Sequence, residues 1–253
     1  MIFAVIGLVS GHSTTFSQTT RTGACSALYY KGTDYTVCKV AQKQYSLQVF
    51  WKSQNGTPFA SLRTLESERL LLKKPLSFSM NGGMFDFDLA PIGLYIENGV
   101  QLKPLNRANG WGNFHLKPNG VFYVNTDGNA GVLDSAAYIA ANVKPKFATQ
   151  SGPMLVVNGK LHPKFTPRGT SRKYRNGVGV AKAKGGEGEI SDGSIYFVIS
   201  QSPITFTEFA TLFRDKLKTQ NALYLDGSVS SLRFDGQSMQ GDFRPLGPMI
   251  GAE

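Results

Sequence analysis

The chain has 253 residues, of which 41% are hydrophobic and 17% charged, and it carries a formal net charge of +10 with a pI near 9.6. This composition is that of a globular protein and excludes a largely disordered chain. The basic surplus favours anionic partners such as phosphate esters, nucleic acid or an acidic cell envelope, with a basic surface that only aids solubility as the alternative. Because no recognition helix or RNA-binding signature accompanies the charge, we expect no nucleic-acid partner.

The N-terminus joins a short apolar segment, residues 2–9, to a polar run, residues 10–22. Eight residues are too few to span a bilayer but match the apolar part of a signal peptide, although its charged start is missing. No later stretch is apolar enough to span a membrane. We therefore expect a signal-like segment, residues 1–24, followed by one domain, residues 25–253, that is periplasmic or secreted.

Cys25 and Cys38 are the only cysteines of the chain. Two cysteines in an exported chain usually pair, so we predict a disulfide that closes a small loop, with free thiols as the alternative. Such a crosslink stabilises a fold by roughly 2–4 kcal/mol. The three histidines, His12, His115 and His162, show no metal-ligand spacing, so we expect no metal and no other cofactor.

Apolar periodicity predicts several strands and two convincing helices in chain order. Strands are expected at residues 45–51, 76–80, 92–96, 121–124, 154–157, 177–181 and 194–200. Helices are expected at residues 61–73 and 206–217, with one or two turns at 134–141, and the last segment, 234–253, is expected to be turn-rich and to fold back over the body. The mixture predicts a single domain of the α/β or α+β class, with a large mixed β-sheet flanked by helices.

The segment 194–225 is the most informative part of the pattern. A predicted strand is followed by the capping box Thr205-Phe206-Thr207-Glu208, an amphipathic helix and the run Leu223-Tyr224-Leu225-Asp226-Gly227-Ser228. This order predicts a crossover between two parallel strands, which places Asp226 at a strand end where open sheets bind ligands. In the alternative interpretation, Asp226 only caps a turn and Gly227 supplies a positive φ.

Polar, glycine-flanked motifs recur at four predicted strand ends. They are Asn81-Gly82-Gly83-Met84-Phe85-Asp86, Gln150-Ser151-Gly152-Pro153, Arg175-Asn176-Gly177-Val178-Gly179, and Asp226-Gly227 with Ser228, Ser230 and Ser231. Paired glycines let the backbone approach a ligand and present N–H groups to an anion, and an arginine can hold a phosphate bidentately. Each motif taken separately also fits a simple turn.

Taken together and in this order, the four motifs resemble the phosphodiester glycosidase domain family. The similarity, most evident to bacterial members, extends to the paired early cysteines, the strand at residues 91–94, the segment 209–215 and a Gly-Pro-Met-Ile end, and covers nearly the whole domain. The chain departs from the family where Ser228 replaces a common second glycine and where Asn176 replaces a common threonine. We expect these departures to bear on the substrate more than on the fold.

The resemblance implies a cofactor-free hydrolase that cleaves the glycosidic C–O bond of a sugar-1-phosphodiester, with a phosphorylated carbohydrate or glycopolymer as substrate. Asp226 is then the base or nucleophile, Arg175 stabilises the leaving phosphate, and Asp86 is a second carboxylate. The expected substrate-binding residues are Asn81, Gly82, Gly83, Phe85, Ser151, Gly152, Gly227 and Ser230. A non-catalytic module for anionic envelope glycopolymers, and a phosphodiesterase that cuts the P–O bond, are the alternatives.

Overall fold

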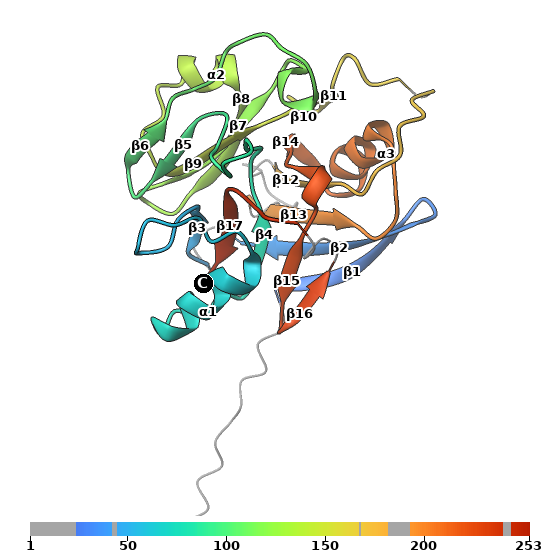
Figure 1. Ribbon diagram of the computed structural model, residues 1–253. Coiled ribbons are helices and arrows are strands. Elements are labelled where there is room, and N and C mark those ends of the chain that lie inside the picture. The colour runs from blue at the N-terminus through green and yellow to red at the C-terminus, as the bar shows by residue number, and fades with distance from the viewer. Residues whose placement is uncertain (1–23, 42–44, 167, 182–192, 240–243) are drawn as a thin grey trace, which may run out of the picture.

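A computed structural model describes residues 24–41, 45–166, 168–181, 193–239 and 244–253 (Figure 1). The predicted signal-like segment lies outside the described residues except for Ala24. Three sheets, with helices at the periphery, make up this part of the chain. The first sheet has the order β1-β2-β13-β12-β14-β10-β11, the second β16-β15-β4-β17-β3, and the third β6-β5-β9-β7-β8.

The strands of the three sheets have the following bounds. In the first sheet they are β1 Cys25–Tyr30, β2 Thr33–Val40, β10 Met154–Val157, β11 Lys160–Leu161, β12 Asn176–Ala181, β13 Ile195–Ser200 and β14 Thr219–Tyr224. In the second they are β3 Leu47–Phe50, β4 Phe78–Asn81, β15 Leu232–Phe234, β16 Gln237–Met239 and β17 Met249–Ala252. In the third they are β5 Tyr95–Glu97, β6 Val100–Lys103, β7 Gly120–Asn125, β8 Ala130–Asp134 and β9 Pro145–Ser151.

The expected class is confirmed as α+β, with sheets flanked by helices in a single domain. The strands form three sheets, and not the single large mixed sheet that the sequence pattern predicted. Every pairing between described strands is antiparallel. Apolar periodicity marks where strands run but carries no information on which strands pair, so the division into sheets was not predictable from it.

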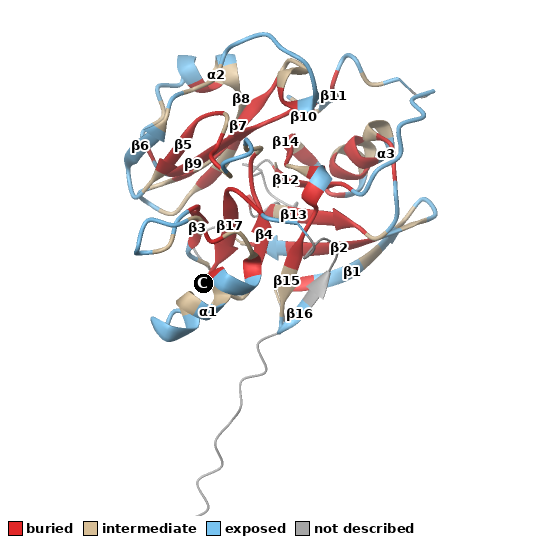
Figure 2. Ribbon diagram, viewed as in Figure 1, coloured by how far each residue is buried: buried red, intermediate tan, exposed pale blue. Residues whose placement is uncertain are grey.

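The three sheets meet in one apolar core. The ring of Phe197 in the first sheet lies 5.2 Å from that of Phe78 in the second and 5.6 Å from that of Phe122 in the third, centroid to centroid. All three side chains are fully buried. Figure 2 shows buried residues on the strands that face this centre and exposed residues toward the periphery. Burial of this apolar surface is the main force that holds the sheets together.

The helices begin where the sequence provides caps. In α1, Leu62–Leu71, the Ser61 hydroxyl accepts from the Thr64 N–H, and in α2, Ser135–Ala140, the Asp134 carboxylate accepts from two backbone N–H groups. The capping box at Thr205 and Glu208 starts α3, Phe206–Thr211, which continues as one π-helical turn, η2, over Leu212–Lys216. These local signals confirm the predicted helix positions. No described helix has the length and apolarity to cross a bilayer.

The predicted crossover is present with one strand inserted. β13 and β14 are both antiparallel to β12, which lies between them, so β13 and β14 run in the same direction. α3 connects them and buries Phe209, with Phe213 of η2, against the first sheet. Asp226 therefore follows the end of β14, as predicted.

The predictions for the two terminal segments have different outcomes. The predicted disulfide is confirmed: Cys25 and Cys38 face each other in the β1–β2 hairpin and are bonded. The C-terminal segment does not simply fold back over the body. Its β17 pairs with both β3 and β4 inside the second sheet, and its four residues are all buried. A short strand that contains Gly251 gives a weak sequence signal, which explains the error.

Candidate active site

The side chain of Asn81, at the end of β4, joins three of the four predicted motifs. Its Nδ2 donates to the backbone oxygen of Asp226 at 2.8 Å. Its Oδ1 accepts from Nδ2 of Asn176 and from the backbone N–H of Ser231, both at 2.8 Å. Asn81 and Asn176 are fully buried. A buried amide with these contacts has little freedom, so it fixes the strand ends relative to one another.

The same network holds the turn that follows β14. The Asp226 N–H donates to the oxygen of Gly82 at 3.2 Å, and the Leu225 N–H donates to the oxygen of Asn176 at 3.1 Å. The Ser230 hydroxyl donates to the oxygen of Gly227 at 3.1 Å. The segment 226–231 is therefore anchored at both ends by hydrogen bonds to β4 and β12.

Asp226 is partly buried at the start of this turn. Its Oδ1 accepts from the Ser228 N–H at 3.0 Å, so Asp226 does cap this turn. Burial raises the pKa of the Asp226 carboxyl, and hydrogen bonds from Ser228 act in the opposite direction. A carboxylate with a raised pKa is a typical candidate for proton transfer, which is compatible with its capping role.

Gly227 is needed for close packing and not for a positive φ. It does not have a positive φ, so that part of the turn interpretation is wrong. A Cβ at this position would collide with the Tyr224 hydroxyl and approach the backbone oxygen of Tyr174 to 3.0 Å. The absence of a side chain lets the turn lie directly against Tyr224. Burial raises the pKa of Tyr224 to about 12, although the neighbouring Arg175 opposes this shift.

A pocket of about 500 Å³ opens beside the turn. The segments that line it are the turn itself, the stretch before β12, the start of α3 and two loops from elsewhere in the chain. The lining residues are Asn113, Ser171, Lys173, Tyr174, Arg175, Phe206, Tyr224, Gly227, Ser228, Val229, Ser230 and Arg244. Three of these side chains are cationic and none is a carboxylate, so the pocket favours an anionic ligand.

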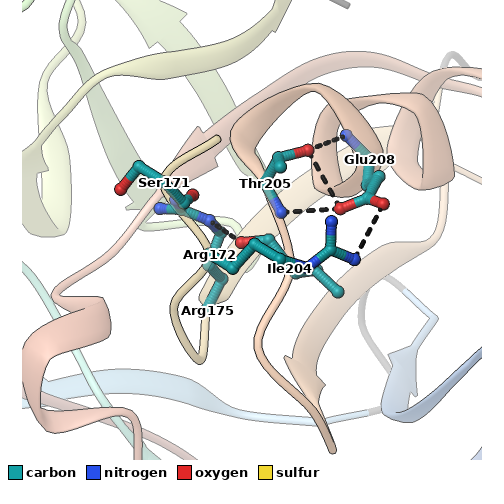
Figure 3. Close-up of polar contacts among 6 residues, drawn as sticks. All are labelled: Ser171, Arg172, Arg175, Ile204, Thr205 and Glu208. Carbon is teal, nitrogen blue, oxygen red and sulfur yellow. Dashed lines mark hydrogen bonds and ion pairs between the residues drawn. The ribbon is translucent and has the colours of Figure 1, made fainter. Parts of the chain in front are cut away.

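Arg175 is the buried cation of this pocket, with 1% of its surface exposed. Its Nε donates to the oxygen of Ile204 at 2.8 Å and its Nη2 to the oxygen of Ser171 at 3.0 Å (Figure 3). The guanidinium carbon lies 3.6 Å from the centroid of the Phe206 ring, a cation–π contact. These contacts hold the guanidinium in one orientation at the pocket wall.

No carboxylate neutralises Arg175 within the described part of the chain. The adjacent Arg172 instead pairs with Glu208 at 3.0 Å, as Figure 3 shows. Burial lowers the pKa of Arg175, the direction expected when a charge loses solvent without a fixed counter-charge. Buried charges in proteins are normally paired, so a cation of this kind in a pocket wall marks an anion-binding position.

The motif at residues 150–153 does not line the pocket but orders a loop that does. The Gln150 side chain accepts from the Leu94 and Asn106 N–H groups, both at 2.9 Å, and thereby orders the start of the loop that carries Asn113 to the pocket. Gly152 packs tightly against Asn119 and the oxygen of Phe114 in the same loop. Ser151 is fully buried and does not line the pocket, and its Oγ has no partner among the described residues.

The first motif is likewise used mainly for packing. The Gly82 N–H donates to the oxygen of Pro248 at 2.7 Å, so it is not available for the anion contact expected of it. A Cβ on Gly83 would collide with the Gln150 oxygen and the Thr149 hydroxyl. Gly83 therefore allows the first and second motifs to lie in contact, whereas Gly82 packs against Pro248 and Met249.

Asp86 and Phe85 are placed away from the pocket lining. Asp86 is exposed, and its Oδ1 accepts from the N–H groups of Asp88 and Ala90, at 3.0 and 2.9 Å, which closes a local loop. Phe85 packs against Gly247. Both follow Gly83 closely in sequence but do not line the pocket, so sequence proximity to the first motif gave a misleading indication for them.

Several pocket residues carried no sequence signal. Asn113 begins a three-residue 3₁₀ turn, and Lys173 and Arg244 lie in irregular segments with no apolar periodicity. Tyr224 and Phe206 read only as apolar positions of a strand and a helix. The described residues contain no cluster of three or more His, Cys, Asp or Glu side chains suited to a metal ion.

A model of the phosphodiester glycosidase family matches residues 75–253, a range that contains all four motifs. The chain belongs to the phosphodiester glycosidase family. The protein YigE of Escherichia coli (strain K12), itself uncharacterized, is 37% identical over 207 residues, which are 82% of this chain and 77% of YigE. The N-terminal hairpin, β1–β2, precedes the range that the family model matches.

Two solved structures have a similar fold. The zebrafish N-acetylglucosamine-1-phosphodiester α-N-acetylglucosaminidase catalytic domain, auto-inhibited by its pro-peptide, superposes with a TM-score of 0.61 at 14% identity, covering 90% of this chain and 80% of that one. A hypothetical protein from Synechocystis superposes with a TM-score of 0.56 at 16% identity, covering 90% of this chain and 61% of that one. At these identities the likeness shows the fold alone.

Proposed function

We propose that this member of the phosphodiester glycosidase family hydrolyses the glycosidic bond of a sugar-1-phosphodiester, of the N-acetylglucosamine-1-phosphodiester type. Water adds to the anomeric carbon, the bond from that carbon to the phosphate oxygen breaks, and the electron pair leaves with the phosphate. The products are free sugar and a phosphomonoester. The observation that carries the proposal is Arg175, a buried cation in a pocket wall without a carboxylate partner among the described residues.

Arg175 is assigned to the phosphate. Two of its donors are used by the oxygens of Ile204 and Ser171, and its ring contact with Phe206 fixes the plane of the guanidinium. A phosphodiester in the pocket would provide the negative charge that this cation lacks. The cation would stabilise the phosphate most strongly as negative charge develops on it during cleavage. A pre-oriented cation needs little reorganisation for this role.

Asp226 is assigned one of two roles: a base that activates the attacking water, or a nucleophile that attacks the anomeric carbon. It directly precedes Gly227 and Ser228, which line the pocket, and burial raises its pKa toward the range of a general base. As a base, its carboxylate takes the proton of the water. As a nucleophile, it forms a glycosyl ester that water then hydrolyses. Asn81 supports either role by holding the Asp226 backbone oxygen.

One observation favours a second candidate, a non-catalytic module for anionic envelope glycopolymers. Asp226 caps its own turn through Oδ1 and does not itself line the pocket. A pocket of this kind with its cations but without an active carboxylate would bind a phosphodiester and leave it intact. The two candidates therefore predict the same anion binding but different outcomes for the bound ester.

The deciding experiment is hydrolysis of the methyl phosphodiester of N-acetylglucosamine 1-phosphate, followed by detection of free sugar. The proposal predicts release by the wild-type protein and loss of release in Asp226→Asn, which retains an oxygen for the Ser228 N–H. Binding of the intact ester by a folded wild-type protein that releases no sugar would favour the binding module.

We also propose that the protein acts in the periplasm or outside the cell. The bonded Cys25 and Cys38 support this, because structural disulfides persist mainly in oxidising compartments. Fractionation of cells that express the full chain with a C-terminal tag would test it. Recovery of the tagged protein from the cytoplasm with reduced cysteines would contradict the assignment.

A further inference from the structure

Two further cations line the same pocket and have no role in the proposed reaction. Lys173 and Arg244 are exposed, in contrast to the buried Arg175. Neither side chain makes a hydrogen bond or an ion pair with another described residue. A pocket of about 500 Å³ is of the size that accommodates a substantial ligand, larger than a single phosphate group.

The backbone ties the position of Lys173 to that of Arg175. The Lys173 N–H donates to the oxygen of Ile204 at 3.1 Å, and the Ile204 N–H returns a bond to the Lys173 oxygen at 2.9 Å. The same Ile204 oxygen accepts from Arg175 Nε at 2.8 Å. One carbonyl therefore anchors both the exposed and the buried cation, which lie two residues apart and face one pocket.

Arg244 reaches the pocket from a different part of the chain. It lies two residues before Leu246, whose N–H donates to the oxygen of Ala60 at 2.9 Å and whose side chain is buried. This contact anchors the segment that carries Arg244 to the loop that precedes α1. The pocket thus receives cations from two independently anchored segments and no carboxylate from any lining residue.

We propose that Lys173 and Arg244 bind a second phosphoryl group of the substrate, at the pocket mouth, while Arg175 holds the phosphate attached to the sugar. This inference rests on the proposed function and narrows the substrate to a class with at least two phosphoryl groups near the scissile bond. A glycosyl diphosphate and a polymer of phosphodiester-linked sugars both carry this chemistry. A monophosphodiester with a neutral second ester group occupies only the inner position.

Binding of inorganic anions tests the second position without any turnover. We would measure the affinity of phosphate and pyrophosphate by calorimetry at matched ionic strength, for the wild type and for Lys173→Ala/Arg244→Ala. Exposed cations each contribute modestly, so we expect pyrophosphate to bind about tenfold more tightly than phosphate to the wild type. The double variant should lose most of that preference.

A matched control separates this effect from a change in net charge. Lys160→Ala/Lys216→Ala removes two exposed lysines that do not line the pocket, so it lowers the net charge equally. The proposal requires this control to keep the wild-type preference for pyrophosphate. Equal loss of the preference in both double variants, or no preference in the wild type, would overturn it.

Hydrolysis distinguishes the two sources of the second phosphoryl group. The substrates are the methyl N-acetylglucosamine-1-phosphodiester, a nucleoside diphosphate sugar and a phosphodiester-linked glycan polymer. In Lys173→Ala/Arg244→Ala, we expect the KM to rise for the diphosphate sugar or the polymer, whichever is cleaved. This rise should exceed the rise in KM for the methyl ester by about tenfold. Equal changes for all cleaved substrates would contradict the inference. If no substrate is cleaved, the proposed reaction fails, and the anion-binding result alone decides the second position.

Discussion

The Asn81 Nδ2 donates to the backbone oxygen of Asp226 at 2.8 Å, across 145 residues of sequence. This bond connects the end of β4 in the second sheet to the exit of β14 in the first. Asn81 Oδ1 also accepts from Asn176, so one buried amide relates the carboxylate-bearing turn to the strand that Arg175 precedes. The position of Asp226 relative to Arg175 thus depends on this amide.

Replacement of Asn81 should therefore destabilise the fold as well as the site. In Asn81→Ala, the Ser231 N–H, the Asn176 amide and the Asp226 oxygen each lose a buried partner. We expect the free energy of unfolding to fall by about 2–4 kcal/mol, because each unpaired buried group is costly. Urea denaturation measures the loss. The exposed Asn109→Ala serves as the control, and a loss in Asn81→Ala no larger than in that control would contradict the role of the network.

Arg175→Lys should weaken catalysis while it retains the positive charge. Lysine cannot donate to Ile204 and Ser171 while presenting a planar group over Phe206, so the cation loses its fixed orientation. We expect kcat/KM for the methyl phosphodiester to fall by about 100-fold. Arg172→Ala is the matched control, because Arg172 pairs with Glu208 on the surface and does not line the pocket. Similar kinetics for both variants would remove Arg175 from the phosphate position.

Ser228→Gly should shift the pH dependence of the reaction. Hydrogen bonds from Ser228 lower the pKa of Asp226, against the larger upward effect of burial. The variant loses the hydroxyl but keeps the N–H, so the pKa of Asp226 should rise further. If Asp226 acts in its ionised form, activity is lost as the pH falls through this pKa, and the acidic limb of the kcat/KM profile should move to higher pH. An unchanged or downward-shifted limb would argue against Asp226 as the ionised group.

Removal of the disulfide should affect stability and leave the reaction intact. Cys25 and Cys38 join β1 to β2, and neither lines the pocket. In Cys25→Ser/Cys38→Ser, we expect the free energy of unfolding to fall by about 2–4 kcal/mol. The kcat of the folded variant, measured well below its unfolding temperature, should match the wild type. A large loss of kcat in the folded variant would show that the hairpin also shapes the site.

Local signals in the sequence predicted where the helices begin. Ser61, Asp134 and Thr205 cap their helices through groups within three residues, so short-range pattern was sufficient. The four motifs were recognisable because each ends or starts a strand. Resemblance to a family then indicated that they belong to one site, which neither spacing nor composition shows.

The remaining features depend on contacts between distant segments. Lys173 and Arg244 reach the pocket from irregular segments whose paths are set by tertiary bonds, such as the one from Leu246 to Ala60. Asp86 was expected near the site because it follows Gly83, yet its carboxylate closes its own loop. Division of the strands into three sheets likewise follows from long-range pairing, which apolar alternation does not encode.

Cleavage in ¹⁸O-labelled water would show which bond of the ester the protein breaks. The methyl phosphodiester of N-acetylglucosamine 1-phosphate would be hydrolysed by the wild-type protein, and the label located by mass spectrometry of the first turnover products. Attack at the anomeric carbon predicts ¹⁸O in the released sugar and none in the methyl phosphate. Label in a phosphate product would show cleavage of the P–O bond and would contradict cleavage of the glycosidic bond.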